Sequence, residues 1–300
     1  MQIIQTDKLT YRYGKFTAIE DVDLGVNRGE IFGFLGPNGA GKTTTIRVLL
    51  DFLRPSEGAA KIFGMDVRAD GKAIRARLGY LPSELTLWDN WTGTQYIKWL
   101  EKVHGKPLLD EANRLAGRLD YDLKRSLRGL STGMKRKMGL IAALAHKPEL
   151  LILDEPTTGL DPLMQNVFHD LMREVREEGR TVFLSSHNLP EVEAICDRVA
   201  IIRGGHIEAT ETVARLTHVA FRWLTLTMSE PVSPNGFSEI AGVSEVSLNG
   251  NGKSIRMQIS GEADMDAVIK QAAAHKVADL SIVQPTLEEI FLTYYGEKEA

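Results

Sequence analysis

The sequence has almost no cysteine, because Cys196 is the single one among its 300 residues. One thiol excludes any disulfide within the chain and is typical of a reducing compartment. It lies in an apolar helical pattern, which predicts a small buried side chain. Apolar runs also stay well short of the roughly 18 residues that a membrane-spanning helix needs. The first residues lack the charged and then apolar pattern of a secretion signal. We therefore expect a cytoplasmic protein.

The sequence also lacks a strong excess of charge of one sign. Its formal net charge is −4, and there is no basic tail that would bind nucleic acid. With 43% hydrophobic and 25% charged residues, it has the composition of an ordinary globular protein. We expect one large domain, or a large and a small one, and no nucleic-acid partner.

A phosphate-binding loop is the feature that the sequence does contain. The motif G-x-x-x-x-G-K-[ST] is matched by Gly36, Pro37, Asn38, Gly39, Ala40, Gly41, Lys42 and Thr43. A predicted strand, 30–35, precedes it, and a predicted helix from Thr44 to Leu53 follows, with its N-terminus facing the phosphates. Backbone N–H groups and Lys42 would hold phosphate oxygens, and the Thr43 hydroxyl suits Mg²⁺. The motif predicts binding of a nucleoside triphosphate.

Two carboxylates follow a predicted strand at residues 150–153. Because ligands bind at the carboxyl ends of strands in such sheets, Asp154 and Glu155 are expected beside the phosphate loop. Asp154 suits the Mg²⁺ shell, and Glu155 is placed to activate an attacking water. An acidic, solvated turn is the simpler alternative for the pair.

The order of patterns predicts two domains. Residues 1–217 read as an α/β domain: β-structure over 2–35, a helical insertion at about 88–146, and apolar strands alternating with helices, which predict a parallel sheet. Residues 218–300 read as a small α+β domain with a hairpin around residues 249–252 and a capped last helix from Thr286 to Tyr295.

Residues 1–217 resemble the ATP-binding cassette family. The resemblance rests on the phosphate loop, the two carboxylates and four further segments. These are Leu130–Met134, similar to the signature Leu-Ser-Gly-Gly-Gln, Gly159–Asp161, Ser185–His187, and an aromatic residue at Tyr13. The resemblance implies a phosphate-loop ATPase core with an N-terminal antiparallel β-subdomain and a helical insertion. It also implies two cassettes that sandwich two ATP molecules.

The resemblance assigns roles to these positions. His187 would contact the γ-phosphate and Tyr13 would stack on adenine. Ser131 and Gly133, which we expect to open a helix, would act on the nucleotide of a second copy, and Asp161 would link the two sites. Thr44, directly after the loop, joins the nucleotide-binding set, and the cofactors implied are ATP and Mg²⁺.

Three positions depart from the family pattern. Thr132 and Met134 stand where the family has Gly and Gln, and Ser83 stands where a glutamine is expected after Leu81 and Pro82. Serine is too short to reach a metal-bound water as glutamine does, so Ser83 is a weak metal candidate. Residues 135–137, Lys-Arg-Lys, read as a solvated face, with the alternative that one cation faces the partner's triphosphate.

Three features resemble bacterial and archaeal exporter ATPases: the Ser-Thr-Gly-Met signature at Ser131–Met134, the length of 300 residues and the ending Pro285–Gly296. Members of that group act with a separate membrane subunit, which implies a peripheral location on the cytoplasmic face of the membrane. The alternatives are a soluble cassette acting on ribosomes or DNA, and a catalytically poor regulatory cassette. An apolar stripe on the predicted last helix (Leu287, Ile290, Phe291, Tyr294) packs within its own chain or, alternatively, on a second copy.

Overall fold

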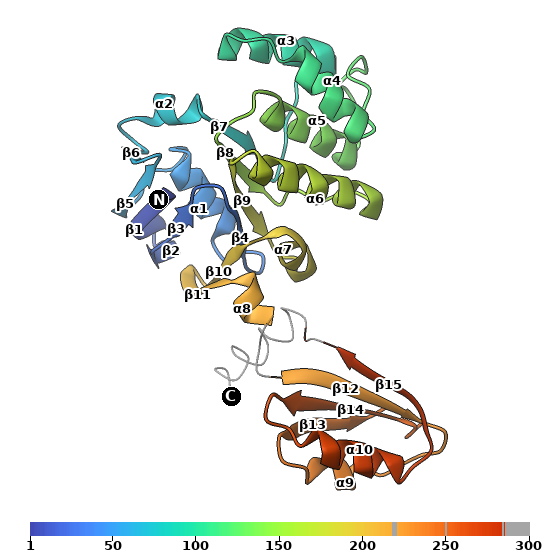
Figure 1. Cartoon of the computed structure of the whole chain (residues 1–300). Helices are drawn as coiled ribbons and strands as arrows, with labels where there is room; N and C mark the ends of the chain where they lie inside the picture. Colours follow the sequence, from blue (N-terminus) through green and yellow to red (C-terminus); the bar gives the residue numbers. More distant parts are fainter. Residues whose placement is uncertain (218–220, 250, 284, 286–300) are drawn as a thin grey trace. The chain divides into compact units, whose positions relative to one another are not determined.

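The fold is taken from a computed structural model, which describes residues 1–217, 221–249, 251–283 and 285. The chain forms two compact units, Met1–Val213 and Ala214–Ala300 (Figure 1). Among the described residues, no helix combines the length and the hydropathy that crossing a bilayer requires.

A six-stranded sheet forms the centre of the first unit. Its strand order is β11-β10-β4-β9-β8-β7, and every neighbouring pair is parallel except β10 with β11. The strands are β4 (Ile31–Leu35), β7 (Leu78–Leu81), β8 (Leu150–Asp154), β9 (Thr181–Ser186), β10 (Arg198–Arg203) and β11 (His206–Thr212). Every residue of β4, β8 and β9 is buried, as their continuous apolar sequences predict. The predicted parallel sheet is therefore confirmed.

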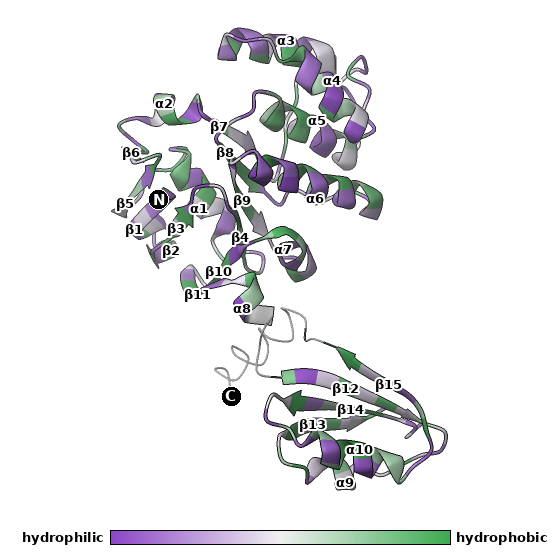
Figure 2. Cartoon of the chain, viewed as in Figure 1, coloured by the Kyte–Doolittle hydropathy of each residue, from purple (hydrophilic) through white to green (hydrophobic). Residues whose placement is uncertain are grey.

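Helices cover the central sheet. In Figure 1, α1 (Lys42–Leu49) lies on one side, and α6 (Pro162–Glu177) and α7 (Leu189–Ile195) lie on the other. In Figure 2 much of the α6 ribbon has the colour of hydrophilic residues. The buried residues of this helix are Phe168, Leu171, Met172 and Val175. The predicted helix ending at Leu53 is too long, since α1 ends at Leu49 and Asp51 adopts a φ of +60°, which turns the chain.

A smaller antiparallel sheet precedes and flanks the central one. It contains β1 (Gln2–Tyr13), β2 (Phe16–Val22), β3 (Gly25–Asn27), β5 (Glu57–Ile62) and β6 (Met65–Asp66), and the short helix α2 (Gly71–Arg75) follows. One core cluster joins both sheets, with members such as Ile4, Ile19, Phe34 and Ile152. The N-terminal antiparallel β-subdomain is thus present.

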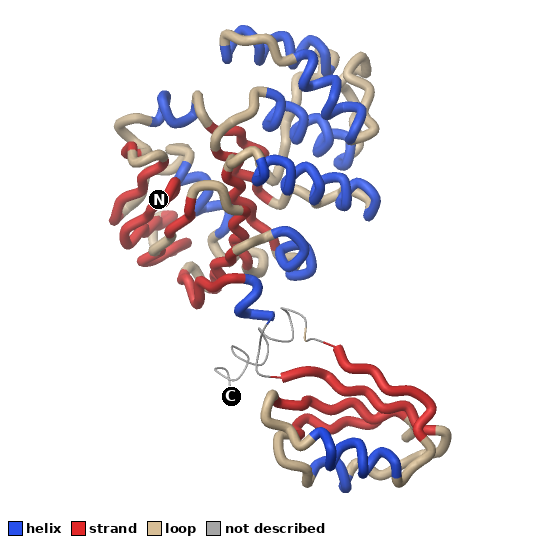
Figure 3. The backbone as a smooth tube through the Cα atoms, in the orientation of Figure 1, coloured by secondary structure: helices blue, strands red, loops and turns tan. Residues whose placement is uncertain are grey.

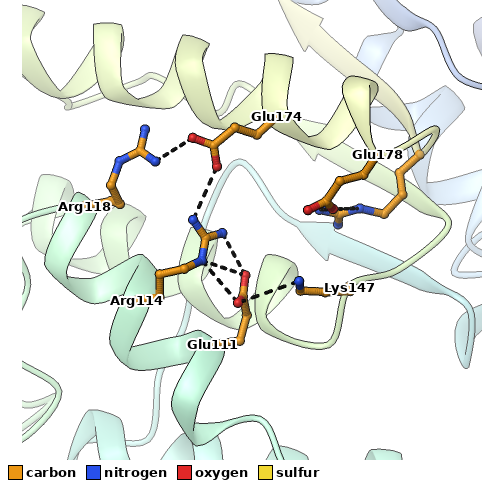
Figure 4. Close-up of polar contacts among 7 residues, drawn as sticks. Glu111, Arg114, Arg118, Lys147, Glu174 and Glu178 are labelled. Carbon is orange, nitrogen blue, oxygen red and sulfur yellow. Dashed lines mark hydrogen bonds and ion pairs between the residues drawn. The ribbon is translucent and has the colours of Figure 1, made fainter.

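Three helices form the predicted helical insertion, seen as a group in Figure 3. They are α3 (Gly93–His104), α4 (Leu109–Arg118) and α5 (Thr132–Ala145). Glu174 of α6 accepts hydrogen bonds from Arg114 and Arg118 of α4 (Figure 4). These side chains are part-exposed, and such pairs contribute about 0–1 kcal/mol each. They tie α4 to α6 only weakly.

The second unit is an antiparallel sheet with helices on one face. The short α8 (Val213–Thr217) leads into it from β11. The strand order is β13-β14-β12-β15, with β12 (Phe221–Met228), β13 (Val243–Leu248), β14 (Ser254–Ser260) and β15 (Val277–Val283). Its helices are α9 (Asn235–Ser238), which the sequence analysis did not predict, and α10 (Met265–Ala273). The expected last helix and its apolar stripe lie outside the described residues.

Candidate nucleotide-binding site

The phosphate loop lies between β4 and α1. Gly41, the residue before α1, has a φ of +111°, a left-handed conformation that favours glycine. A Cβ at Gly36 would lie 2.3 Å from the carbonyl oxygen of Ile202, so this position also requires glycine. Lys42 is 6% exposed, and its Nζ donates to the carbonyl oxygens of Gly36 (2.6 Å) and Pro37 (3.1 Å). The loop thus curls around its own lysine.

Asp154 lies at the carboxyl end of β8 and is fully buried. Thr43 Oγ1 donates to its Oδ2 at 2.9 Å, and Ser185 Oγ donates to its Oδ1 at 2.5 Å. Ser185 comes from β9, the strand beside β8. The structure therefore brings Thr43 and Asp154 together as the sequence predicts, and it adds Ser185, which the sequence analysis had not given a role of its own.

Glu155 links the loop to the end of β9. Its carboxylate lies 3.3 Å from Lys42 Nζ through Oε1 and 2.7 Å from His187 Nδ1 through Oε2. Its own backbone has a φ of +51°, which is rare for a residue with a side chain and is typical of functional sites. The backbone and hydroxyl oxygens of Ser185 both accept from the Glu155 N–H. Loop lysine, carboxylate and histidine form one connected cluster.

A buried glutamate lies behind His187. Ser186 Oγ donates to Glu191 Oε2 at 2.6 Å and accepts from the Asn188 N–H at 3.0 Å, so it fixes the turn that carries His187. Glu191 is 4% exposed, and burial raises the pKa of its carboxyl. Glu191 was not predicted from the sequence, although its place four residues after the histidine, on α7, was a usable signal.

Tyr13 ends β1, next to the turn into β2, and half of its side chain is exposed. Ile19 of β2 touches the phosphate loop, because a Cβ at Gly41 would lie 2.6 Å from Ile19 Cγ2. Ile19 pairs with Tyr11, which contacts Tyr13 edge-on at 4.7 Å. The hairpin that carries Tyr13 therefore adjoins the phosphate loop.

The signature segment opens α5, as predicted. Ser131 caps the helix and accepts from the Met134 N–H. A Cβ at Gly133 would lie 2.6 Å from the carbonyl oxygen of Gly159, and Asp161, two residues beyond Gly159, caps α6. The signature and the segment after Glu155 are thus neighbours, and both Ser131 and Asp161 are exposed.

The solvated face predicted for residues 135–137 is wrong for its central residue. Arg136 is 3% exposed and donates to the carbonyl oxygens of Pro82 and Ser83, both at 2.7 Å. Burial lowers the pKa of its guanidinium. Lys135 and Lys137 remain part-exposed. Ser83 contributes its backbone carbonyl to this contact.

The donor groups of this site fit a magnesium nucleotide. Mg²⁺ prefers oxygen ligands and keeps waters and substrate phosphates in its shell. Thr43 and Asp154 supply hydroxyl and carboxylate oxygens directly beside the phosphate loop. In the described part of the chain, no group of three or more His, Cys, Asp or Glu side chains could hold a metal ion.

Comparisons with known proteins agree with this geometry. Residues 19–158 match the family described as ABC transporter, and residues 221–295 match the C-terminal domain of the DrrA1-3-like ATP-binding proteins. The chain is 30% identical to the linearmycin resistance ATP-binding protein LnrL of Bacillus subtilis, over 98% of each chain. It is 32% identical to the daunorubicin/doxorubicin resistance ATP-binding protein DrrA of Streptomyces peucetius, over 98% of this chain and 92% of the relative.

A further relative and a solved structure are also ATP-binding subunits of transporters. The bacitracin transport ATP-binding protein BcrA of Bacillus licheniformis is 40% identical over 68% of each chain. A solved ATP-binding subunit of an ABC transporter aligns with a TM-score of 0.66 and 29% identity, covering 71% of this chain and 91% of that one. These relatives do not favour a cassette acting on ribosomes or DNA. The protein belongs to the ATP-binding cassette family, and it is an ATP-hydrolysing subunit of the transporter type.

Proposed function

We propose that this chain is the motor of a two-component exporter, which binds ATP with Mg²⁺, pairs with a second copy and drives a separate membrane subunit. One observation carries the proposal: the Lys42–Glu155–His187 cluster meets the Thr43–Asp154 pair at the mouth of the phosphate loop. These groups are the ones that phosphoryl transfer to water requires.

Each group of the cluster has a distinct part in hydrolysis. On ATP binding, Lys42 exchanges the carbonyls of Gly36 and Pro37 for phosphate oxygens, together with the loop N–H groups. Thr43 and Asp154 would hold Mg²⁺, which neutralises phosphate charge. Glu155 then orients and deprotonates the attacking water, and His187 contacts the γ-phosphate.

The second copy supplies the remaining contacts. Ser131 and Gly133 stand exposed or half-exposed at the N-terminus of α5, where N–H groups favour an anion. We place them on the partner's triphosphate and Asp161 between the two sites, while the exposed ring of Tyr13 stacks on adenine.

The names of the relatives support export of antibiotics or other toxic compounds. LnrL and DrrA are named for resistance and BcrA for bacitracin transport. LnrL and DrrA match over nearly the whole chain, and the DrrA-type C-terminal domain is part of that match. The cargo class we propose is therefore an antibiotic.

An apolar groove on the first unit offers a docking surface for the membrane subunit. It has a volume of about 660 Å³, and its lining includes Phe52, Trp99 and Val103, which are 36–59% exposed. Trp88 stacks edge-on against Trp99 at 4.8 Å and adds a further exposed ring. Exposed apolar surface of this kind marks interaction sites. We propose that a short amphipathic helix of the membrane subunit occupies it.

The function is tested by expressing the full chain together with the membrane protein encoded beside its gene in a drug-sensitive host. The pair should confer resistance and ATP-dependent efflux, and Lys42→Ala should abolish both because phosphate binding is lost. Purified wild-type chain without ATPase activity, or a Lys42→Ala pair that still exports, would overturn the proposal.

The docking surface has its own matched pair of variants. Val103→Asp puts a charge into the groove, and Ile269→Asp puts one on α10 of the second unit, at 59% and 54% exposure respectively. Only Val103→Asp should lose co-purification with the membrane subunit, with the ATPase activity of the isolated chain kept. Equal co-purification of both variants would remove the groove from this role.

A further inference from the structure

One face of α5 lies directly against β7 and the loop that follows it. A Cβ at Gly139 would lie 2.5 Å from Leu81 and 2.7 Å from Leu85, and a Cβ at Gly79 would lie 2.2 Å from the carbonyl oxygen of Ala143. Positions 136, 139 and 143 follow the spacing of one helix face. The backbones of helix and strand approach closely here because both contact points are glycines.

Arg136 continues this face one turn closer to the signature. Its two terminal nitrogens each donate a 2.7 Å hydrogen bond, one to Pro82 and one to Ser83. The planar guanidinium suits two successive carbonyls, which a lysine cannot match with the same geometry. A buried cation is costly unless its donors are satisfied. The two hydrogen bonds therefore offset part of the cost of burying the Arg136 guanidinium.

The two elements that Arg136 joins lead to the two nucleotide-binding faces of the chain. Ser131 caps the N-terminus of α5 (Thr132–Ala145), where we place the partner's triphosphate. β7 pairs with β8 in parallel, with Leu81 opposite Leu153, and the next residue of β8 is Asp154. A displacement of the loop at Pro82 would therefore reach the carboxylate end of β8 and the signature end of α5 together.

We propose that Arg136 is a positioning residue for ATP hydrolysis, which couples the N-terminal part of α5 to the loop after β7. The side chain at position 83 is too short to span this part of the site, and the connection comes instead from α5 through the backbone carbonyl of Ser83. The inference rests on the proposed function, because it assigns a residue to the same hydrolytic site.

A merely structural role for Arg136 predicts different measurements. Loss of a structural contact lowers the melting temperature and weakens nucleotide binding and turnover together. Loss of a positioning contact leaves the phosphate loop intact, so nucleotide affinity stays and kcat falls. The split between affinity and kcat therefore distinguishes the two.

The experiment uses the purified full-length chain with Arg136→Met, Arg136→Gln and Arg136→Lys. We measure steady-state ATP hydrolysis, the affinity for a fluorescent ATP analogue and the melting temperature. Arg136→Met should lower kcat about 10–100-fold, since misplacement by about an ångström has effects of this size. The affinity should stay within about twofold, and Arg136→Lys should recover part of the rate.

Arg180→Met is the control, because the Arg180 side chain is also mostly buried (14% exposed) but pairs with Glu178 on the surface. It should keep kcat. If Arg136→Met does not fold, the kcat and nucleotide affinity of Arg136→Gln and Arg136→Lys test the inference instead. A folded variant with wild-type kcat, or with affinity and kcat reduced in parallel, overturns the inference. Wild-type chain without hydrolysis would instead contradict the proposed function.

Discussion

The two units of this protein differ most in what they bury. The first encloses charged side chains in its interior, among them Lys42, Arg136, Asp154 and Glu191, whereas the buried side chains described in the second are apolar. Burying a charge costs free energy unless hydrogen bonds and opposite charges offset it. The first unit bears part of that cost beside the phosphate loop, where Lys42 and Asp154 are buried and hydrogen-bonded.

The sheets show the same difference. The parallel strands β4, β8 and β9 are buried throughout, and the polar groups after β8 and β9 meet at one edge. In the second unit, β12 alternates between buried and part-exposed residues, and all of β15 is exposed. Antiparallel strands do not bring their carboxyl ends to one edge, so this sheet offers no comparable site.

Glu155→Gln is the change with the largest expected effect. The amide keeps the shape of the side chain but removes the base, so turnover should fall about 10²–10⁴-fold. ATP binding should persist, and the ATP-bound pair of chains should live longer. Steady-state ATPase assays and sedimentation with ATP measure both.

The second unit supplies a matched control for this change. Glu245 of β13 also has a left-handed φ, +47°, next to an irregularity in the strand pairing, but its side chain is exposed. Glu245→Gln should leave turnover unchanged. If Glu155→Gln hydrolyses ATP at near the normal rate, Glu155 is not the base.

The second prediction removes a fully buried aromatic side chain of the second unit. Phe237 is fully buried, and Phe→Ala changes of this kind cost about 3–5 kcal/mol. A unit this small has little stability to spare, so Phe237→Ala should unfold it while ATP binding by the first unit persists. Separate thermal transitions, followed with and without ATP, measure this. Loss of ATP binding would show that the units do not fold independently.

Sequence patterns predicted which residues meet beside the phosphate loop, because that part of the site is local. The phosphate loop is a continuous motif, and the carboxylates follow a buried strand directly. Arg136 could not be predicted, because its partners lie more than fifty residues earlier and its neighbours in sequence suggest a solvated face. Four-residue α9 escaped prediction for another reason, since Pro231 and Pro234 dominate the pattern there.

Buried ionisable groups should also make the first unit sensitive to acid. His146 is 5% exposed and stacks on His104 at 4.1 Å, and burial lowers its pKa to about 4. The unfolded chain, with a histidine pKa near 6.5, binds the proton more readily. The contribution of His146 to the free energy of unfolding therefore keeps its full value above pH 6.5 and is lost as the pH falls toward 4. The expected loss is about 2 kcal/mol between pH 7.5 and 5.

Urea unfolding of the full chain at the two pH values tests this. His146→Gln should remove most of the difference, whereas His206→Gln should keep it because His206 is exposed. A wild-type chain equally stable at both values would contradict the assignment to His146.

The smallest expected effect concerns the side chain at position 83. Arg136 binds the backbone carbonyl of Ser83, which every residue has, so Ser83→Gln keeps the buried charge satisfied. It adds an amide that can reach a metal-bound water, and one such hydrogen bond corresponds to about a two- to tenfold change in rate. We expect higher ATPase activity or a tighter Mg²⁺ dependence, measured by Mg²⁺ titration of steady-state hydrolysis. Ser83→Ala removes the hydroxyl alone and should match the wild type. If Ser83→Gln changes neither quantity beyond about twofold, the neighbouring Glu84 or a water already fills the place, and the backbone contact with Arg136 is the only part that position 83 plays.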